Sequence, residues 1–124
     1  MKITPYVFVE GCAEALDYYM NIFGGKVTFK QKADDSDKLL HARIDFNENY
    51  SLYFSDIMQK VDFGDNCTIS FEFDREEDIK EAYKKLEKDS EIRMELQETF
   101  WGATFALLKD KYNVVWQLNY EHKK

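Results

Sequence analysis

The sequence CAEALDYYMNIFGGKVTFKQK, residues 12–32, joins a helical pattern to a strand pattern through two glycines. Apolar side chains recur in it with the 3.6-residue period of an amphipathic helix, at Ala15, Leu16, Tyr19, Ile22 and Phe23. We therefore predict a helix over Cys12–Phe23. Gly24 and Gly25 favour its end there, because glycine accepts the left-handed backbone of a helix C-terminus. Residues 26–32 are predicted to form a strand.

Strand patterns flank this segment on both sides. Residues 3–10, rich in aromatic and β-branched side chains, predict a strand before the helix. Residues 39–46 predict another, in which Leu40, Ala42, Ile44 and Phe46 alternate with His41, Arg43 and Asp45. A turn at 47–49 then leads into a returning strand over 50–55. The order is strand, helix, strand, strand, strand.

The same order returns in the second half of the chain. Strands are predicted at 67–74, 92–97, 103–108 and 114–120, and a helix has its apolar stripe over 79–86. Asp74 and Glu77 have the spacing of a capping box at the start of that helix. Residues 56–65 form a connecting loop. We predict an α+β fold in one domain, 1–124, made of two paired βαβββ modules at about 1–56 and 66–124. Their curved antiparallel sheets surround a cup, with the helices outside.

Composition excludes several classes of partner. The chain has 124 residues, a net charge of −7 and no basic patch, so neither nucleic acid nor an anionic membrane is an expected partner. No apolar run reaches the 18 residues of a membrane span, and the N-terminus lacks a signal-peptide core. We expect a cytoplasmic protein. Cys12 and Cys67 fit reduced buried thiols, and with His41 and His122 they lack the spacing of a zinc site.

Strand alternation also predicts which side chains line the cup. Ile69, Phe71 and Phe73 should pack under the second helix, and the alternate positions should face away from it. Applied to all strands, this places a mixed aromatic and polar set in the cup: Tyr6, Phe8, His41, Arg43, Tyr53, Ser70, Glu72 and Gln117. The alternative is a polar sheet face open to solvent, with Arg43 and Glu72 in a cross-strand salt bridge.

Several short motifs resemble those of a known family. They are ETFWG at 98–102, DKY at 110–112, VWQLN at 115–119, ITPYVF at 3–8 and the helix signature from Ala13 to Gly25. Together they resemble the PhnB-like branch of the vicinal oxygen chelate superfamily, which includes glyoxalase I, bleomycin-resistance proteins and extradiol dioxygenases. The resemblance implies the paired-module fold and a homodimer. It also places the Phe100–Trp101 loop near the cup, where the two aromatics could contact a ligand.

The resemblance further implies four metal-ligand positions. Many members hold a divalent metal with His, Glu or Gln side chains from the first and fourth strands of each half. Those positions fall at Thr4 or Tyr6, Tyr53, Thr68 and Gln117. Only Gln117 is a usual ligand type for zinc, nickel or magnesium. We therefore expect no metal and no other cofactor, with a divalent metal as the disfavoured alternative.

Three functions remain open from the sequence. The first is a small-molecule-binding protein without the usual metal site, with Tyr6, Phe8, Arg43, Tyr53, Ser70, Phe100, Trp101 and Gln117 around the ligand. The second is a lyase, isomerase or oxygenase acting on a small metabolite, with His41 or Glu72 as general base. The third is a dimeric interaction module whose cup is filled by side chains.

Overall fold

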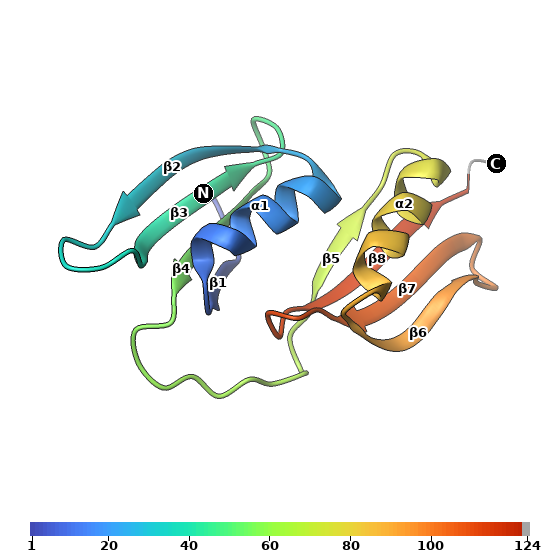
Figure 1. Ribbon diagram of the computed structural model, residues 1–124. Helices are drawn as coiled ribbons and strands as arrows, with labels where there is room; N and C mark the ends of the chain where they lie inside the picture. The colour runs from blue at the N-terminus through green and yellow to red at the C-terminus, as the bar shows by residue number, and fades with distance from the viewer. Residues whose placement is uncertain (123–124) are drawn as a thin grey trace. The chain divides into compact units, whose positions relative to one another are not determined.

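The computed structural model describes residues 1–122 and divides into two compact units, Met1–Asp62 and a second that begins at Phe63. Each unit holds one four-stranded sheet and one helix (Figure 1). The α+β class and the strand–helix–strand–strand–strand order predicted for both halves are confirmed. Each of the two helices has 12 residues, and no helix in residues 1–122 is long and apolar enough to span a bilayer.

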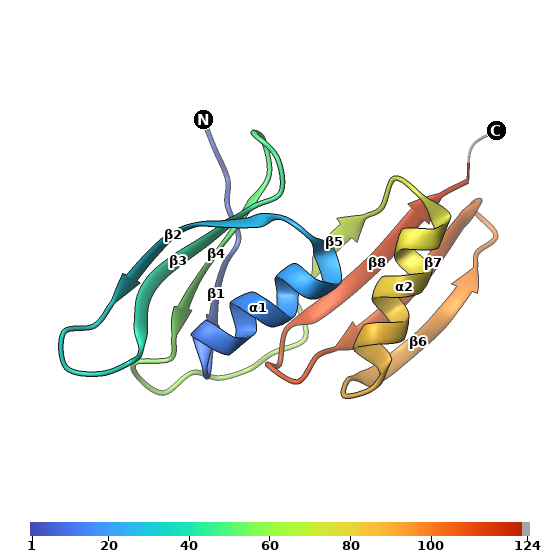
Figure 2. The ribbon, with the colours of Figure 1, turned by 45° about the horizontal axis from the view of Figure 1, so that its top comes forward.

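The first unit has the strand order β1-β4-β3-β2, with α1 lying along one face of the sheet (Figure 2). Its elements are β1 (Tyr6–Val9), α1 (Cys12–Phe23), β2 (Lys26–Lys32), β3 (Leu39–Asp45) and β4 (Ser51–Asp56). The helix packs on the sheet through Leu16 and Tyr19, against Ile44 and Phe54, all of which are buried. The ring of Tyr19 stacks on that of Phe54 with centroids 5.5 Å apart.

The second unit repeats this topology with the order β5-β8-β7-β6. Its elements are β5 (Ile69–Glu72), α2 (Glu76–Glu87), β6 (Glu91–Glu98), β7 (Ala103–Lys109) and β8 (Val115–Glu121). Ile79 and Leu86 of α2 are fully buried, as are Trp116 and Leu118 of β8. Phe73 is buried as predicted, while Ile69 and Phe71 on the edge strand are half-buried.

Both sheets are mixed, which corrects the expectation of antiparallel sheets. β1 pairs with β4 in parallel, as β5 does with β8, while the remaining pairs are antiparallel. The reason is the helix after the first strand. It returns the chain to its starting end, so the second strand runs in the direction of the first, and two hairpins then give the fourth strand that direction too.

The predicted alternation of β3 is wrong at Leu40. This side chain is exposed, and the preceding Leu39 is buried in its place. The register explains the change, because Gln31 pairs with His41 and Lys32 with Leu39, so Leu40 is an extra residue without a partner on β2. Such a bulge shifts the side-chain parity on one side of it. Ala42 and Ile44 lie beyond the bulge and are buried as predicted.

The capping box predicted at Asp74 is also wrong. The N-cap of α2 is Arg75, and no side chain caps this end of the helix. Instead, the Arg75 guanidinium donates two hydrogen bonds to the Asp78 carboxylate, at 3.0 and 2.9 Å. Acidic side chains at Glu76, Glu77 and Asp78 still favour the helix, since they lie at the positive end of its dipole.

One buried carboxylate fastens three segments of the first unit. Asp56 ends β4, where the sequence predicted the start of a loop. Its Oδ1 accepts hydrogen bonds from the N–H groups of Gly11 (3.1 Å) and Cys12 (3.0 Å), and its Oδ2 accepts one from Leu39 N–H (2.7 Å). Asp56 thus supplies the cap that α1 lacks locally. Burial, and secondarily the Asp56 charge, raise the pKa of the Cys12 thiol to about 12, so Cys12 is an inert packing residue. Cys67 is exposed, so the prediction of a buried thiol is wrong there.

A second buried carboxylate organises the turn between β7 and β8. Asp110 Oδ1 accepts hydrogen bonds from the N–H groups of Tyr112 (2.8 Å) and Val114 (3.1 Å), and its Oδ2 accepts one from the Trp116 indole N–H (2.8 Å). Asn113 takes a left-handed backbone, φ 70°, within this turn. The DKY motif and the following tryptophan are therefore parts of one structural device.

Gly25 is a position where the backbone meets β3 closely. Its φ is +84°, and a Cβ there would lie 2.9 Å from both Ile44 Cγ2 and Phe46 Cδ1 and 3.0 Å from the Asp45 carbonyl oxygen. We expect Gly25→Ala to lower the free energy of unfolding by about 3 kcal/mol, because backbone strain and overpacking add. Gly11→Ala is the matched control, since φ is +72° there but no atom lies within 4 Å of the added Cβ. It should cost about 1 kcal/mol. If urea denaturation gave the same loss of free energy of unfolding for both variants, the close contact of Gly25 with β3 would be contradicted.

Candidate functional site

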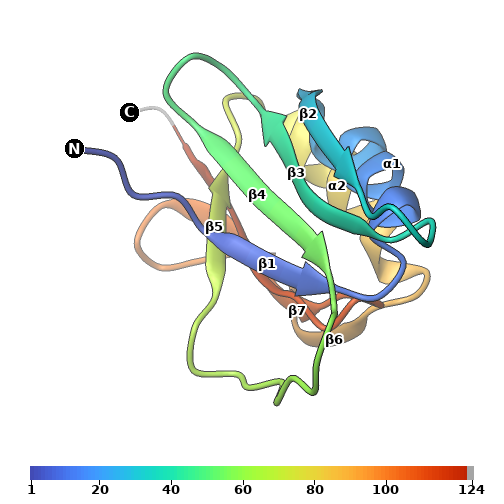
Figure 3. The ribbon, with the colours of Figure 1, turned by 90° about the vertical axis from the view of Figure 1, so that its left-hand side faces the viewer.

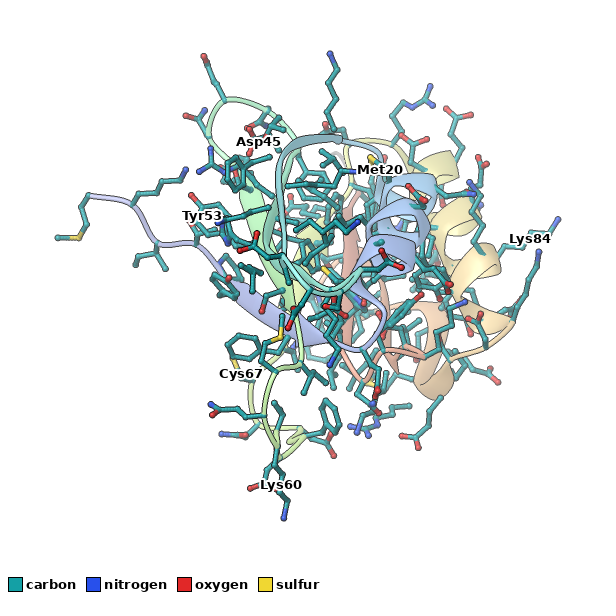
Figure 4. All side chains as sticks on the ribbon, turned by 60° about the vertical axis from the view of Figure 1, so that its left-hand side comes forward. Met20, Asp45, Tyr53, Lys60, Cys67 and Lys84 are labelled. Atoms are coloured by element: carbon teal, nitrogen blue, oxygen red, sulfur yellow. The ribbon has the colours of Figure 1, made fainter. Side chains whose placement is uncertain are left out.

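The sheet of the first unit has one face that α1 does not cover. Figure 3 shows β1, β4, β3 and β2 side by side in front of the helix. Directly paired residues share a face, and the pairs Tyr6–Tyr53, Tyr53–Arg43, Arg43–Phe29 and His41–Gln31 all belong to this one. Figure 4 shows Tyr53 projecting from β4 on the side away from α1. The predicted site residues of the first half thus lie together.

Aromatic rings surround His41 on this face. Its ring centroid lies 5.4 Å from that of Tyr6, 5.5 Å from Phe29 and 5.1 Å from Tyr53. Phe8 extends the group, 5.4 Å from Tyr6. We call these five residues the aromatic cluster. Tyr6, Phe8 and Phe29 remain 44%, 50% and 45% exposed. A contiguous exposed aromatic surface makes this sheet face a candidate binding site.

Phe29 was not predicted as a site residue. Alternation along β2 does not identify its face, because the pairing with β3 shifts register between Val27 and Phe29. The available signal was its residue type, as Phe29 is the one aromatic among seven residues of an otherwise mostly polar strand. A single exposed phenylalanine is common on protein surfaces, so this signal gains meaning only from the His41 ring that lies beside it.

His41 is oriented by a hydrogen bond with the Tyr6 hydroxyl. The Tyr6 oxygen and His41 Nδ1 are 2.9 Å apart. The two residues come from β1 and β3, the strands that flank β4, so the bond spans the middle of the sheet face. A histidine whose Nδ1 is engaged in this way presents Nε2 for contact with a ligand. This geometry suits either ligand recognition or proton transfer.

Two cations lie at the Tyr53 end of the aromatic cluster. The Arg43 guanidinium lies 4.9 Å from the Tyr53 ring centroid and Lys2 Nζ lies 5.7 Å from it, and Lys2 also donates a hydrogen bond to the Tyr53 hydroxyl oxygen at 3.5 Å. Partial desolvation raises the pKa of Tyr53, but the Lys2 hydrogen bond and the charges of Arg43 and Lys2 outweigh it, so this pKa lies below its usual value. Arg43 Nε is buried and has no hydrogen-bond partner in residues 1–122.

Asp45 is the acidic neighbour of these cations, and it is engaged elsewhere. Its carboxylate accepts a hydrogen bond of 2.5 Å from the Ser51 hydroxyl. That bond lowers the pKa of Asp45, against a smaller effect of desolvation, and further contributions come from Thr28, Arg43 and Lys2. Asp45 is therefore ionised at neutral pH. It makes no ion pair within 4.0 Å of either cation among the described residues.

The predicted site residues of the second half divide into two groups. Ser70, Glu72 and Gln117 share the sheet face opposite Trp116 and Leu118, with Ser70 paired to Gln117. The Gln117 amide donates a hydrogen bond of 3.0 Å to Thr68 Oγ1, while Ser70 and Glu72 are exposed on the edge strand. Phe100 and Trp101 lie in the β6–β7 loop with ring centroids 5.0 Å apart, exposed rather than tucked into the core of their unit. A cup shared by both modules stays a prediction.

One group in residues 1–122 could place three metal-ligand atoms together, and it was not predicted. Glu76, Glu98 and His122 each bring one such atom within 4.8 Å of the others. They come from the start of α2, the end of β6 and the residue after β8, so no local spacing could reveal them. His122 Nε2 is hydrogen-bonded with Thr104 Oγ1 at 2.8 Å. Both glutamates are exposed, as acidic surface groups without a metal commonly are.

Comparison with known proteins agrees with the fold. The profile of the glyoxalase/bleomycin resistance protein/dioxygenase superfamily matches residues 3–118. Protein YjdN of Escherichia coli K12 is 26% identical over 140 residues, covering 96% of this chain and 95% of its own. Protein PA1353 of Pseudomonas aeruginosa has a TM-score of 0.84 at 27% identity, covering 99% of each chain. A PhnB protein of Bacillus cereus also has a TM-score of 0.84, at 26% identity, and covers 97% of this chain and 99% of its own.

Proposed function

Because this chain belongs to the glyoxalase/bleomycin resistance protein/dioxygenase superfamily, we propose that it binds a small molecule on the aromatic cluster of its first unit. The observation that carries the proposal is the exposure of Tyr6, Phe8 and Phe29 around a histidine that is already hydrogen-bonded in place. A purely structural sheet face would not leave three aromatic rings about half exposed together. A bound ligand would remove that apolar surface from water.

Binding proceeds in this proposal without the metal that many superfamily members hold. The family's position on β4 is Tyr53, whose hydroxyl accepts a hydrogen bond from the Lys2 ammonium and whose ring contacts the Arg43 guanidinium. The two positive charges beside the Tyr53 hydroxyl oppose the binding of a divalent cation. On β8 the Gln117 amide is engaged with Thr68, which offers only a hydroxyl. The side chains at these positions do not fit the divalent metal of the family.

A second candidate function is enzymatic, with His41 as general base. The specific observation in its favour is the Tyr6–His41 hydrogen bond of 2.9 Å, which orients the imidazole as a partner group does in general-base catalysis. Glu72, the other predicted base, makes no ion pair within 4.0 Å among the described residues and is exposed. His41 is therefore the stronger choice. His41→Ala would abolish turnover of a true substrate, whereas it would only weaken simple binding.

We further propose that the protein acts as a homodimer, as the sequence resemblance implies, and in the cytoplasm, as the composition and N-terminal sequence lead us to expect. A dimeric interaction module without a ligand is the competing possibility. Sedimentation velocity at high micromolar concentration separates the states, and a monomer there would contradict the dimer. A ligand that binds stoichiometrically to the aromatic cluster would contradict the pure interaction module.

The proposed site is tested by mapping ligand binding residue by residue. A library of ring-containing metabolites is screened by thermal shift, and hits are titrated into ¹⁵N-labelled protein. We expect the largest amide shifts in β1, β3 and β4, and a loss of affinity of at least about tenfold in Tyr6→Ala and Phe29→Ala. Tyr50→Ala is the matched control, an exposed aromatic outside the cluster, and should bind unchanged. Shifts confined to the second unit, or equal losses in all three variants, would contradict the site.

A further inference from the structure

Resting on the proposed function, we infer that the ligand of this face is an aromatic anion, whose acidic group contacts Arg43 and Lys2 while its ring lies against the aromatic cluster. Among residues 1–122, Arg43 has no carboxylate partner, and its Nε is buried without a hydrogen-bond acceptor.

The chain has three arginines, and two of them are neutralised by carboxylates. Arg75 binds Asp78 and Glu77, at 2.9 and 3.1 Å, and Arg93 binds Glu91 and Asp65, at 2.8 and 3.1 Å. Arg43 makes no ion pair with any carboxylate among residues 1–122. In a chain of 24 acidic residues and net charge −7, acids are plentiful, so an arginine without one is an exception.

The environment of Arg43 shows what it lacks. Its guanidinium lies over the Tyr53 ring, and its Nε is buried with no hydrogen-bond acceptor. Burying an N–H of a charged group without an acceptor costs free energy, and native proteins rarely leave one so. A carboxylate on the guanidinium would supply the missing acceptor after a small rotation of the side chain. The charge of Asp45 acts on Arg43 from beyond 4.0 Å, while its carboxylate accepts a hydrogen bond from Ser51 instead of from the guanidinium.

Lys2 gives the same end of the site a second positive charge. Its ammonium is 5.7 Å from the Tyr53 ring centroid, on a ring that Arg43 also contacts, and it makes no ion pair among the described residues. Two unpaired cations that share one aromatic ring are suited to a ligand with a negative charge. The neighbouring Tyr6, Phe8 and Phe29 offer ring faces and edges, so the remainder of the ligand is best matched by an aromatic ring.

The test uses two probes of the same shape that differ only in charge, 1-naphthoate and 1-naphthamide, titrated by amide chemical shifts. We expect naphthoate to bind at least about tenfold more tightly than naphthamide, since hydrogen bonds to charged groups are the stronger ones. Arg43→Met should remove that preference by weakening the binding of naphthoate, and Lys2→Met should reduce the preference. Arg75→Met, at the exposed N-cap of α2, is the matched control and should keep the preference for naphthoate.

The outcomes separate this inference from the proposed function. Equal affinity of the two probes for the wild-type protein, with shifts in β1, β3 and β4, would overturn the anionic class and leave the binding site standing. Binding of neither probe up to millimolar concentration would count against the aromatic cluster as a site for ring compounds and overturn both. If Arg43→Met does not give a folded spectrum, Lys2→Met decides, because Lys2 lies before β1 and outside every helix and strand. An unchanged preference in Lys2→Met would then contradict the inference.

Discussion

Asp56→Ala should lower the free energy of unfolding by about 4 kcal/mol, because it removes a buried acceptor from three backbone N–H groups at once. Those groups belong to Gly11, Cys12 and Leu39, and the bonds are 2.7 to 3.1 Å long. The N–H groups of Cys12 and Leu39 lie in the interior, where water does not replace the lost acceptor. The capping of α1 and the hydrogen bond to Leu39 of β3 should be lost together.

The measurement is urea denaturation followed by far-ultraviolet circular dichroism, with amide hydrogen exchange to locate the loss. Exchange should accelerate most at Cys12 and Leu39. Asp56→Asn keeps one acceptor oxygen but places an NH₂ group against an N–H donor. It should therefore lower the free energy of unfolding by about half as much as Asp56→Ala does. Asp17→Ala, on the exposed side of α1, should change stability by less than about 0.5 kcal/mol. A loss below about 1 kcal/mol in Asp56→Ala would show that the three bonds are not cooperative.

Asp110→Ala should destabilise the second unit by about 3 to 4 kcal/mol. The substitution removes the acceptor of two turn N–H groups and leaves the indole N–H of Trp116 buried without a partner from this carboxylate. Trp116 is fully buried, so water does not replace the lost carboxylate acceptor. The β7–β8 turn should loosen, and the packing of β8 against α2 with it.

Tryptophan fluorescence reports this change, because both tryptophans belong to the second unit. The emission of Trp116 should shift to longer wavelength at lower urea concentration than in the wild type. Asp110→Asn keeps an oxygen that accepts the turn N–H groups but places an NH₂ group against the indole N–H. Its midpoint of urea denaturation should therefore lie between those of the wild type and Asp110→Ala. Asp74→Ala is the control, since Asp74 is exposed and α2 has no side-chain cap. If Asp74→Ala lowered the free energy of unfolding as much as Asp110→Ala, the buried contacts of Asp110 would not explain the loss of stability.

Much of the fold follows from the sequence because its signals are local. The bounds of α1 and β2 are those predicted from periodicity and the two glycines. The parallel pairing of β1 with β4 was missed, since alternation carries no information on strand direction. Asp56 was missed for a related reason, as its partners lie 17 to 45 residues away in the chain. Nothing in its neighbours marks it as buried.

The candidate site was found in part. Tyr6, His41, Arg43 and Tyr53 were predicted from alternation, and they lie together because direct cross-strand partners share a face. Phe29 was missed owing to the register shift in β2. The unpartnered Nε of Arg43 is a property of three-dimensional packing, so no sequence pattern could have indicated it.

The motifs that carried the family resemblance have structural roles in this chain. Thr99 closes the β6–β7 turn, where its hydroxyl donates to the Ala103 carbonyl at 3.0 Å and accepts from Ala103 N–H at 3.2 Å. Asp110 and Trp116 close the next turn. These residues specify hairpins rather than chemistry, which is why a sequence can resemble the family closely while its ligand must be inferred from other positions.

The Asp56 carboxylate also has a consequence for the order in which the chain assembles during synthesis. The start of α1 is capped by a residue that the ribosome adds 44 positions later. A nascent chain that stops before β4 therefore carries a helix whose first N–H groups lack the Asp56 cap, beside a sheet that lacks the strand joining β1 to β3. The cap of α1 and the contact with Leu39 can form only after Asp56 has left the exit tunnel, so both belong to the last stage of synthesis of the first unit.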